Sequence, residues 1–156
     1  MFRAKASPAN PDSVKDITNA AIRLLARREH TFAELQVKLL DRGYQEPAVL
    51  QVLEDLANRG VQSDERFTES YVRWRLMCGF GPLKIKQELK DRGVKSPLIA
   101  QYTQLSKQEW MDNLNKLRQK RFGMIVPKND EERAKQARFL QSRGFDCSDI
   151  QCVFNE

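Results

Sequence analysis

A leucine and an Arg-Gly pair followed by an apolar residue recur three times along the chain. The copies are KLLDRGY (38–44), ELKDRGV (88–94) and RFLQSRGF (138–145), and their glycines are 50 and 51 residues apart. A period of this length indicates a repeat architecture. An apolar residue one turn before a glycine, with another just after it, is typical of a helix that ends in a left-handed cap. Each copy therefore predicts the end of one helix and a turn into the next.

In the first unit the apolar pattern predicts three helices. Asp12 or Ser13 is the expected cap of the first helix. Thr31 and Glu34 have the spacing of a capping box, which opens the second, and Pro47 suits the first turn of the third. The apolar positions at helical spacing are Val14, Ile17, Ala21, Leu24, Leu25, Leu35, Leu39, Val49, Val52, Leu53 and Leu56.

The second unit repeats this plan. Ser63 is expected to open its first helix, the pair Gly81-Pro82 restarts the chain for the second, and Pro97 begins a shorter third helix. The positions expected to face inward are Phe67, Tyr71, Trp74, Cys78, Ile85, Leu89, Ile99 and Tyr102.

The third unit differs in its second helix and in the connection before it. The connection FGMIVPKN (122–129) is longer than its counterparts. Gln136 stands where Leu35 and Ile85 stand in the other units, so the sequence predicts looser packing here. The expected core positions are Trp110, Leu114, Leu117, Ala137, Leu140, Ile150, Val153 and Phe154.

Nine helices and no strong strand follow from these patterns. The predicted fold class is all-α, with three tandem three-helix repeats over 13–60, 61–105 and 106–156, after a flexible tail over 1–12. Each unit alone is too small to bury a large core, which is why units of this kind stack.

Composition places the chain among soluble globular proteins. It has 156 residues, 40% hydrophobic and 31% charged, and no apolar run near the roughly 20 residues that cross a bilayer. The N-terminal residues lack the apolar stretch of a secretion signal, so a cytoplasmic location is expected. Cys78, Cys147 and Cys152 are expected to be reduced, buried or half-buried thiols, because no second Cys or His pair completes a metal site.

The residues of an active site are missing. His30 is the single histidine, and its place before a helix cap predicts a solvated loop residue. The turn Gly79-Phe80-Gly81-Pro82 lacks the pattern of a phosphate-binding loop, and its proline removes an amide donor. We therefore expect no enzyme activity, no cofactor and no metal. Several acidic residues stand four positions before a base, a spacing that stabilises exposed helices; these pairs are Glu34–Lys38, Glu69–Arg73, Glu88–Arg92 and Glu131–Lys135.

Positive charge gathers in the second and third units. The net charge is +6 and the sequence pI is about 9.4, which suggests an anionic partner. Residues 61–105 carry eight basic and five acidic side chains, and residues 106–156 carry ten and eight. Cations near helix ends also stabilise the helix dipole and keep a surface soluble. Some basic residues belong to none of the four acid–base pairs named above. Those that gather near one another are Arg27, Arg28, Arg75, Lys86, Lys90, Lys116, Arg118, Lys120 and Arg121.

Tandem helix-turn-helix DNA readers are an alternative that the charges disfavour. The recognition helix would follow each Arg-Gly pair. The first such helix carries Glu46, Glu54 and Asp55, the second has no basic residue, and the third carries Asp149 and Glu156. Arg and Lys for base edges and phosphates are absent there, so the basic residues favour tracking of a backbone or a protein groove.

Four stretches resemble the RecX family of recombination regulators, in the family's order. They are ARREHTFAEL (26–35), SDERFTESYVRWR (63–75), GFGPLKIKQELKDRGV (79–94) and RFLQSRGFDCSDI (138–150). The second stretch followed by the third is the most specific part.

The resemblance implies an elongated, curved helical array that binds the RecA filament on single-stranded DNA. It would inhibit the recombinase, ATPase and co-protease activities of RecA, and so modulate recombination, DNA repair and the SOS response. It also implies binding to single-stranded and double-stranded DNA without sequence specificity. From the matching block come the candidate partner contacts Arg73, Arg75, Lys84 and Lys86, and the structural residues Tyr71, Trp74, Gly81 and Leu89.

Two alternatives remain open at this stage. A non-specific DNA-binding helical repeat protein could hinder RecA by competing for the strand, and a helical adaptor could serve an unrelated protein. A monomer is expected, because the repeats cover one another. If the cations act together as a binding surface, neutralising Lys116, Arg118, Lys120 and Arg121 should weaken binding with little change in thermal unfolding.

Overall fold

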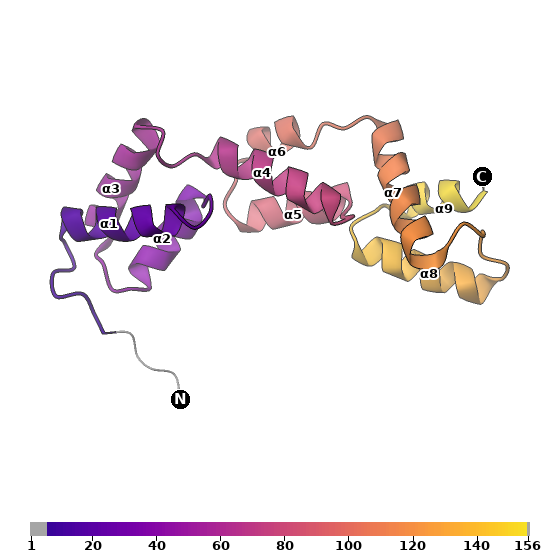
Figure 1. The fold of residues 1–156 in the computed structure, drawn as a ribbon, viewed down its shortest axis with the longest axis horizontal. Coiled ribbons are helices and arrows are strands. Elements are labelled where there is room, and N and C mark those ends of the chain that lie inside the picture. Colours follow the sequence, from indigo (N-terminus) through magenta and orange to yellow (C-terminus); the bar gives the residue numbers. More distant parts are fainter. Residues whose placement is uncertain (1–5, 156) are drawn as a thin grey trace. The chain divides into compact units, whose positions relative to one another are not determined.

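The computed structural model describes residues 6–155 (Figure 1). Within these residues the chain forms helices and turns and no strand. The helices are α1 (Val14–Leu25), α2 (Phe32–Leu40), α3 (Glu46–Asn58), α4 (Asp64–Met77), α5 (Pro82–Asp91), α6 (Ser96–Tyr102), α7 (Lys107–Phe122), α8 (Asp130–Ser142) and α9 (Cys147–Asn155). The all-α prediction is confirmed.

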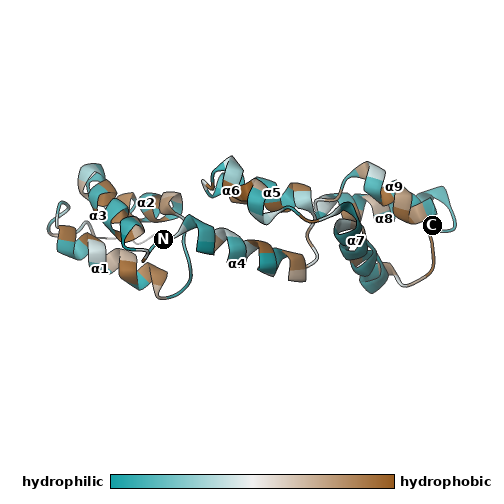
Figure 2. Cartoon of the chain, turned by 90° about the horizontal axis from the view of Figure 1, so that it is seen from above, coloured by the Kyte–Doolittle hydropathy of each residue, from teal (hydrophilic) through white to brown (hydrophobic). Residues whose placement is uncertain are grey.

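The described chain divides into two compact units. Unit 1 comprises residues up to Thr68 together with Arg92–Val94, and unit 2 comprises Glu69–Asp91 and the residues from Lys95 onward. Both are built from helices that carry hydrophobic and hydrophilic residues (Figure 2). No helix in the described part of the chain combines the length and apolar character needed to cross a membrane.

Unit 1 encloses a core between α1, α2 and α3, which all pack against one another. The predicted apolar stripes supply it, and burying side chains of this size is the main stabilising contribution to such a fold. Its buried members are Ile17, Ala20, Ala21, Leu24, Leu35, Leu39, Val49, Val52, Leu53 and Leu56.

The predicted helix starts are found where the sequence places them. Ser13, rather than Asp12, caps α1, and its side chain accepts a hydrogen bond from the Asp16 amide. Thr31 and Glu34 form the predicted capping box of α2, with both reciprocal hydrogen bonds present. These contacts satisfy amides that would otherwise lack a partner at a helix N-terminus.

The three repeated glycines adopt the left-handed backbone that the pattern predicts. Gly43, Gly93 and Gly144 have φ of 94°, 79° and 94°. At the first, the Gly43 amide donates to the Leu40 carbonyl and the Tyr44 amide donates to the Leu39 carbonyl. Gly144 ends α8 in the same way, and this pair of bonds is the Schellman cap.

Two of the repeated Arg-Gly pairs also hold the start of another helix. The Arg92 carbonyl accepts a hydrogen bond of 2.7 Å from the Thr31 hydroxyl at the start of α2. The Arg143 carbonyl accepts one of 2.7 Å from the Gly81 amide, just before α5. A Cβ added at Gly144 would lie 2.5 Å from the backbone nitrogen of Lys84. The recurring motif therefore both ends its own helix and forms a close backbone junction with the second helix of the preceding repeat.

Several burial predictions are wrong. Trp74 is 52% exposed, and Cys78 is exposed as well. The buried side of α4 carries Phe67, Thr68, Tyr71 and Val72. It therefore shares Phe67 and Tyr71 with the predicted stripe but includes the residue after each of them instead of Trp74 and Cys78. Successive residues of a helix differ by about 100° in direction. Two adjacent faces of α4 therefore share Phe67 and Tyr71, and the apolar pattern alone does not decide which of the two faces is buried.

The cysteines and the histidine also depart from their predicted surroundings. Cys147 and Cys152, like Cys78, are exposed rather than buried. His30 is only 3% exposed, although the sequence predicts a solvated loop residue. The segment between α1 and α2 is held by residues far along the chain, because Gln62 donates to the His30 carbonyl and Asp64 accepts from the Phe32 amide.

In the third repeat α7, α8 and α9 pack against one another. Gln136 is buried at 7% exposure, and its side-chain oxygen has no hydrogen-bond partner among the described residues. The polar residue in an apolar register thus enters the core instead of turning out. Leaving a buried polar atom unpaired costs about 1–3 kcal/mol, so Gln136 lowers the stability of this repeat relative to an apolar residue at the same position.

Candidate partner-binding surface

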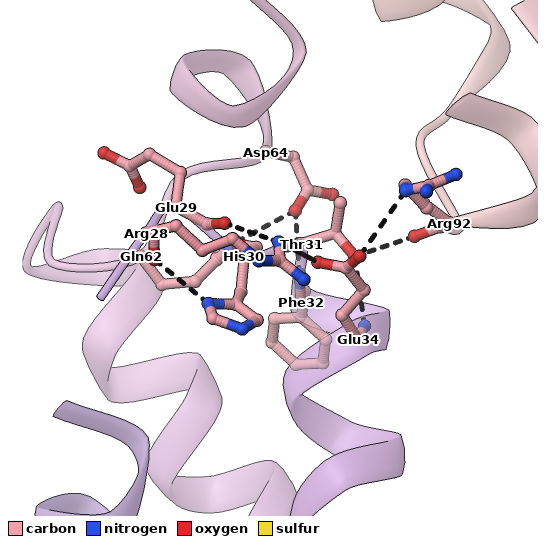
Figure 3. A network of polar contacts seen from close by, with 9 residues as sticks. All are labelled: Arg28, Glu29, His30, Thr31, Phe32, Glu34, Gln62, Asp64 and Arg92. Atoms are coloured by element: carbon pink, nitrogen blue, oxygen red, sulfur yellow. Dashed lines mark hydrogen bonds and ion pairs between the residues drawn. The ribbon is translucent and has the colours of Figure 1, made fainter. Parts of the chain in front are cut away.

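A polar network surrounds the start of α2 in unit 1 (Figure 3). Asp64, the first residue of α4, accepts hydrogen bonds from the Phe32 amide at 2.8 Å and from the Gln62 side chain at 2.9 Å. Gln62 also donates to the His30 carbonyl at 3.2 Å. Because its carboxylate and amide groups are paired in the described structure, this network serves to fix backbone segments.

His30 belongs to the same network. Its Nδ1 donates to the Arg28 carbonyl at 3.0 Å, which fixes the tautomer because a carbonyl can only accept. Burial lowers the pKa of His30 below its ordinary value, and the hydrogen bond to Arg28 opposes that change only in part. The ring is therefore a neutral structural group near neutral pH.

The two candidate cations that follow α1, Arg27 and Arg28, differ in what they contact. Arg28 donates to the Glu29 carbonyl at 2.8 Å and forms an ion pair with Glu34 at 3.2 Å. Glu34 also contacts Arg92 at 3.6 Å, so its carboxylate is occupied by residues other than the predicted partner, Lys38. Arg27 is exposed, which leaves it the more accessible of the two arginines.

Arg73 and Arg75 have opposite surroundings although they are two residues apart on α4. Arg73 forms the predicted pair with Glu69 at 3.0 Å, and its side chain is 71% exposed. Arg75 is 14% exposed and binds the carboxylate of Glu88 with two nitrogens. The Tyr71 hydroxyl donates to the same carboxylate at 2.8 Å. Arg73 is thus available to a partner, whereas Arg75 has a structural role.

Aromatic rings complete the site of Arg75. The guanidinium carbon is 3.6 Å from the centre of the Phe80 ring and 4.9 Å from that of Trp74, distances at which a cation is attracted to an aromatic face. Burial alone would lower the pKa of Arg75, but the hydrogen bonds and charge of Glu88 outweigh it, and the pKa is raised. The side chain stays charged and fixed.

The candidate lysines of α5 lie on two sides of the helix. Lys84 is exposed, and its backbone lies at the junction with Gly144. Lys86 and Lys90 are one turn apart and line a groove of about 410 Å³ together with Leu83, which is 55% exposed. The predicted shared face of these two lysines is confirmed.

Helix α7 divides its four candidate cations between two faces. Lys116, Lys120 and Arg121 are exposed, but Arg118 is 4% exposed. Its guanidinium donates to the Ile125 carbonyl at 3.4 Å, and its Nε has no partner among the described residues. A residue two positions from Lys116 and Lys120 points about 200° away from them. Arg118 therefore belongs to the interior, and counting cations along the sequence wrongly grouped it with the surface residues.

The exposed cations of α7 line a groove within unit 2. This basic groove has a volume of about 490 Å³ and contains no acidic residue among those described as lining it. Its wall is formed by Leu76, Met77, Cys78, Gly79, Asn113, Lys116, Leu117, Lys120, Arg121, Phe139 and Arg143. Carboxylates or phosphates fit such a wall, because a cationic cleft concentrates anions.

Arg143 is the groove residue that the sequence did not single out. It was assigned only to the repeated helix end, yet its guanidinium carbon is 5.2 Å from the Phe139 ring centre and 4.9 Å from that of Phe80. Its contribution depends on α8 packing against α7 and on the contact of Arg143 with Phe80, which local spacing does not show. The signal that could have found it is the Arg before the third glycine, in a repeat that carries ten basic and eight acidic side chains.

Comparison with known proteins gives the decisive observation. Three family models match the chain in order: the first three-helix domain of RecX over residues 18–56, the second over 63–102 and the third over 107–154. The chain belongs to the RecX family. The prediction of three three-helix repeats is thereby confirmed, and the matched ranges lie within the predicted repeats.

Relatives named "Regulatory protein RecX" cover most of the chain. The protein from Halorhodospira halophila is 42% identical over 137 residues, which are 88% of this chain and 85% of the relative. The protein from Legionella pneumophila (strain Corby) is 40% identical over 138 residues, which are 88% and 92% of the two chains. The RecX relatives thus support a regulatory role.

Two solved structures share the fold. RecX from Lactobacillus salivarius superposes with a TM-score of 0.77 at 20% identity, over 91% of this chain and 94% of the other. A second structure, described as regulatory protein RecX, superposes with a TM-score of 0.80 at 22% identity, over 92% of this chain and 73% of the other.

Among the described residues, no group of three or more His, Cys, Asp or Glu is placed to hold a metal ion.

Proposed function

We propose that this protein regulates RecA by binding the RecA filament on single-stranded DNA and inhibiting its recombinase, ATPase and co-protease activities. By this action it modulates recombination, DNA repair and the SOS response. The observation that carries the proposal is membership of the RecX family over all three helical domains. RecA is the partner that the family implies.

The charges of the molecule support a filament as the target. The exposed candidate contacts are Arg27, Arg28, Arg73, Lys84, Lys86, Lys90, Lys116, Lys120 and Arg121. They occur in all three repeats, so a partner could make several modest contacts whose effects add through effective concentration. Arg28 contributes if its pair with Glu34 opens, while Arg75 and Arg118 act by holding the helices in place.

Retention on bead-bound single-stranded DNA tests the proposal. One set of beads carries naked DNA, the other carries RecA filaments assembled with a slowly hydrolysed ATP analogue, and salt is raised stepwise. Pure phosphate binding to a single strand weakens with a log–log slope of about −0.7 per contact. We expect the protein to stay on filaments at salt concentrations that release it from naked DNA. Equal release from both would make it a strand competitor instead.

A further inference from the structure

We propose that the basic groove holds an acidic peptide segment of a protein partner, with its carboxylates on Lys116, Lys120, Arg121 and Arg143 and an aliphatic side chain against Met77 and Leu117. The inference rests on the proposed function, in that it names the ligand chemistry of one site for a protein partner. The groove lies wholly within unit 2.

The charge of the groove is uncompensated. None of its four cations has a carboxylate within ion-pair distance in the described part of the chain. Three of them come from one face of α7, which is drawn largely as hydrophilic in Figure 2, and Arg143 comes from the end of α8. Four cations around one hollow attract a ligand with several negative charges.

The apolar part of the groove is also unpartnered. Met77 is 80% exposed at the end of α4, and Leu76 and Leu117 line the same hollow. A volume of about 490 Å³ lies within the range of about 300–1,000 Å³ typical of ligand sites. Room for an aliphatic side chain between cations matches an acidic segment that contains a leucine, isoleucine or methionine.

A single-stranded nucleic acid fits this groove less well. Strand-binding sites stack bases on open aromatic faces, and Phe139 is the aromatic residue that lines the groove. Its ring has the guanidinium carbons of Arg121 and Arg143 at 5.7 Å and 5.2 Å from its centre. Phe122 packs against it edge to face at 5.4 Å. The ring is thus half-buried and partly covered by these neighbours, and the remaining apolar wall is aliphatic.

Alkylation of the cysteines locates the ligand directly. Cys78 lines the groove, whereas Cys147 and Cys152 are exposed elsewhere and serve as internal controls. The probe is a synthetic peptide with three acidic residues on each side of a leucine, and the rates of alkylation by iodoacetamide are followed by mass spectrometry. We expect the peptide to slow alkylation of Cys78 several-fold and to leave the other two rates unchanged.

Variants and competitors complete the test. Lys116→Gln, Lys120→Gln and Arg121→Gln together should weaken peptide binding on the order of tenfold. The control variant combines Lys95→Gln, Lys107→Gln and Lys135→Gln, which remove the same charge at exposed positions outside the groove. It should weaken peptide binding far less. Met77→Gln should weaken binding of the leucine peptide but not of the peptide with serine in its place.

Three outcomes would overturn the inference. They are unchanged alkylation of Cys78, equal protection of all three cysteines, and protection by oligo-dT that matches or displaces the peptide. The last would assign the groove to nucleic acid. Inhibition of RecA by the wild-type protein, measured separately, would leave the proposed function standing in each case. Peptide binding without any effect on RecA would contradict the proposed function alone.

Discussion

Gly60 and Gly144 both have positive φ, but they differ in the space around them. A Cβ at Gly60, with φ of 72°, would meet nothing within 4 Å, whereas at Gly144 it would meet the backbone of Lys84. Gly60→Ala should cost about 1–2 kcal/mol from the left-handed backbone alone. Gly144→Ala should cost clearly more, because α5 and α8 must separate, and thermal unfolding of both variants measures the difference. Equal losses would contradict the close junction.

His30 predicts how stability depends on pH. Its pKa in the folded protein is lowered from the ordinary 6.5 by burial, so the unfolded chain takes up a proton first as the pH falls. The contribution of His30 is therefore complete above the unfolded pKa and is lost as the pH falls toward the folded value. The melting temperature of the wild type should fall more than that of His30→Gln from about pH 7 to about pH 5. Parallel curves would refute this.

At the scale of helices, Arg75 and Arg73 form a matched pair on α4. Arg73→Gln removes an exposed ion pair and should change the free energy of unfolding by no more than about 0.5 kcal/mol. Arg75→Gln leaves Glu88, whose side chain is 16% exposed, with one fewer charged partner and removes the contacts with Phe80. We expect a loss of about 1–3 kcal/mol, measured by urea unfolding. Equal stability of the two variants would show that Arg75 is a surface residue.

Helix α7 gives a second comparison, of binding with stability. Neutralising Lys116, Lys120 and Arg121 together should weaken filament binding and leave the melting temperature nearly unchanged, because all three side chains are exposed. Adding Arg118→Gln should lower the melting temperature, since that side chain is buried. Calorimetry of the triple and quadruple variants separates the two effects. An equally stable quadruple variant would place Arg118 on the surface after all.

The elements themselves could largely be predicted from the sequence, because their signals are local. Caps such as Thr31 with Glu34, and glycines such as Gly93, act through bonds within a few residues of the chain. The burial of His30 and Gln136 could not be predicted in this way. It depends on which helix lies across each residue, and so on contacts between segments that are distant in the sequence.

The candidate surface was predictable in part for the same reason. Cations on one helix, such as Lys116 and Lys120, share a face through helical spacing. Whether a cation is available depends on residues far along the chain: Glu88 occupies Arg75, and Arg143 enters the groove from α8. Counting charges located the basic region, while the tertiary contacts determined which cations remain available to a partner.

For the whole molecule, the proposal is that three helical repeats act together on one nucleoprotein filament. Repeat proteins present extended surfaces because each unit packs mainly on its neighbours. Modest contacts on each repeat then reinforce one another only if the partner spans several of them. A continuous filament meets that condition, and short stretches of naked strand meet it less well.

Hydrolysis of ATP by RecA tests this account most directly. The assay contains single-stranded DNA in excess, with this protein added well below the RecA concentration, and is repeated with more DNA. The account predicts inhibition that persists when DNA is added, because the protein acts on the filament. Inhibition that disappears with extra DNA, or that never occurs, would contradict it and leave a strand competitor or an adaptor for another protein.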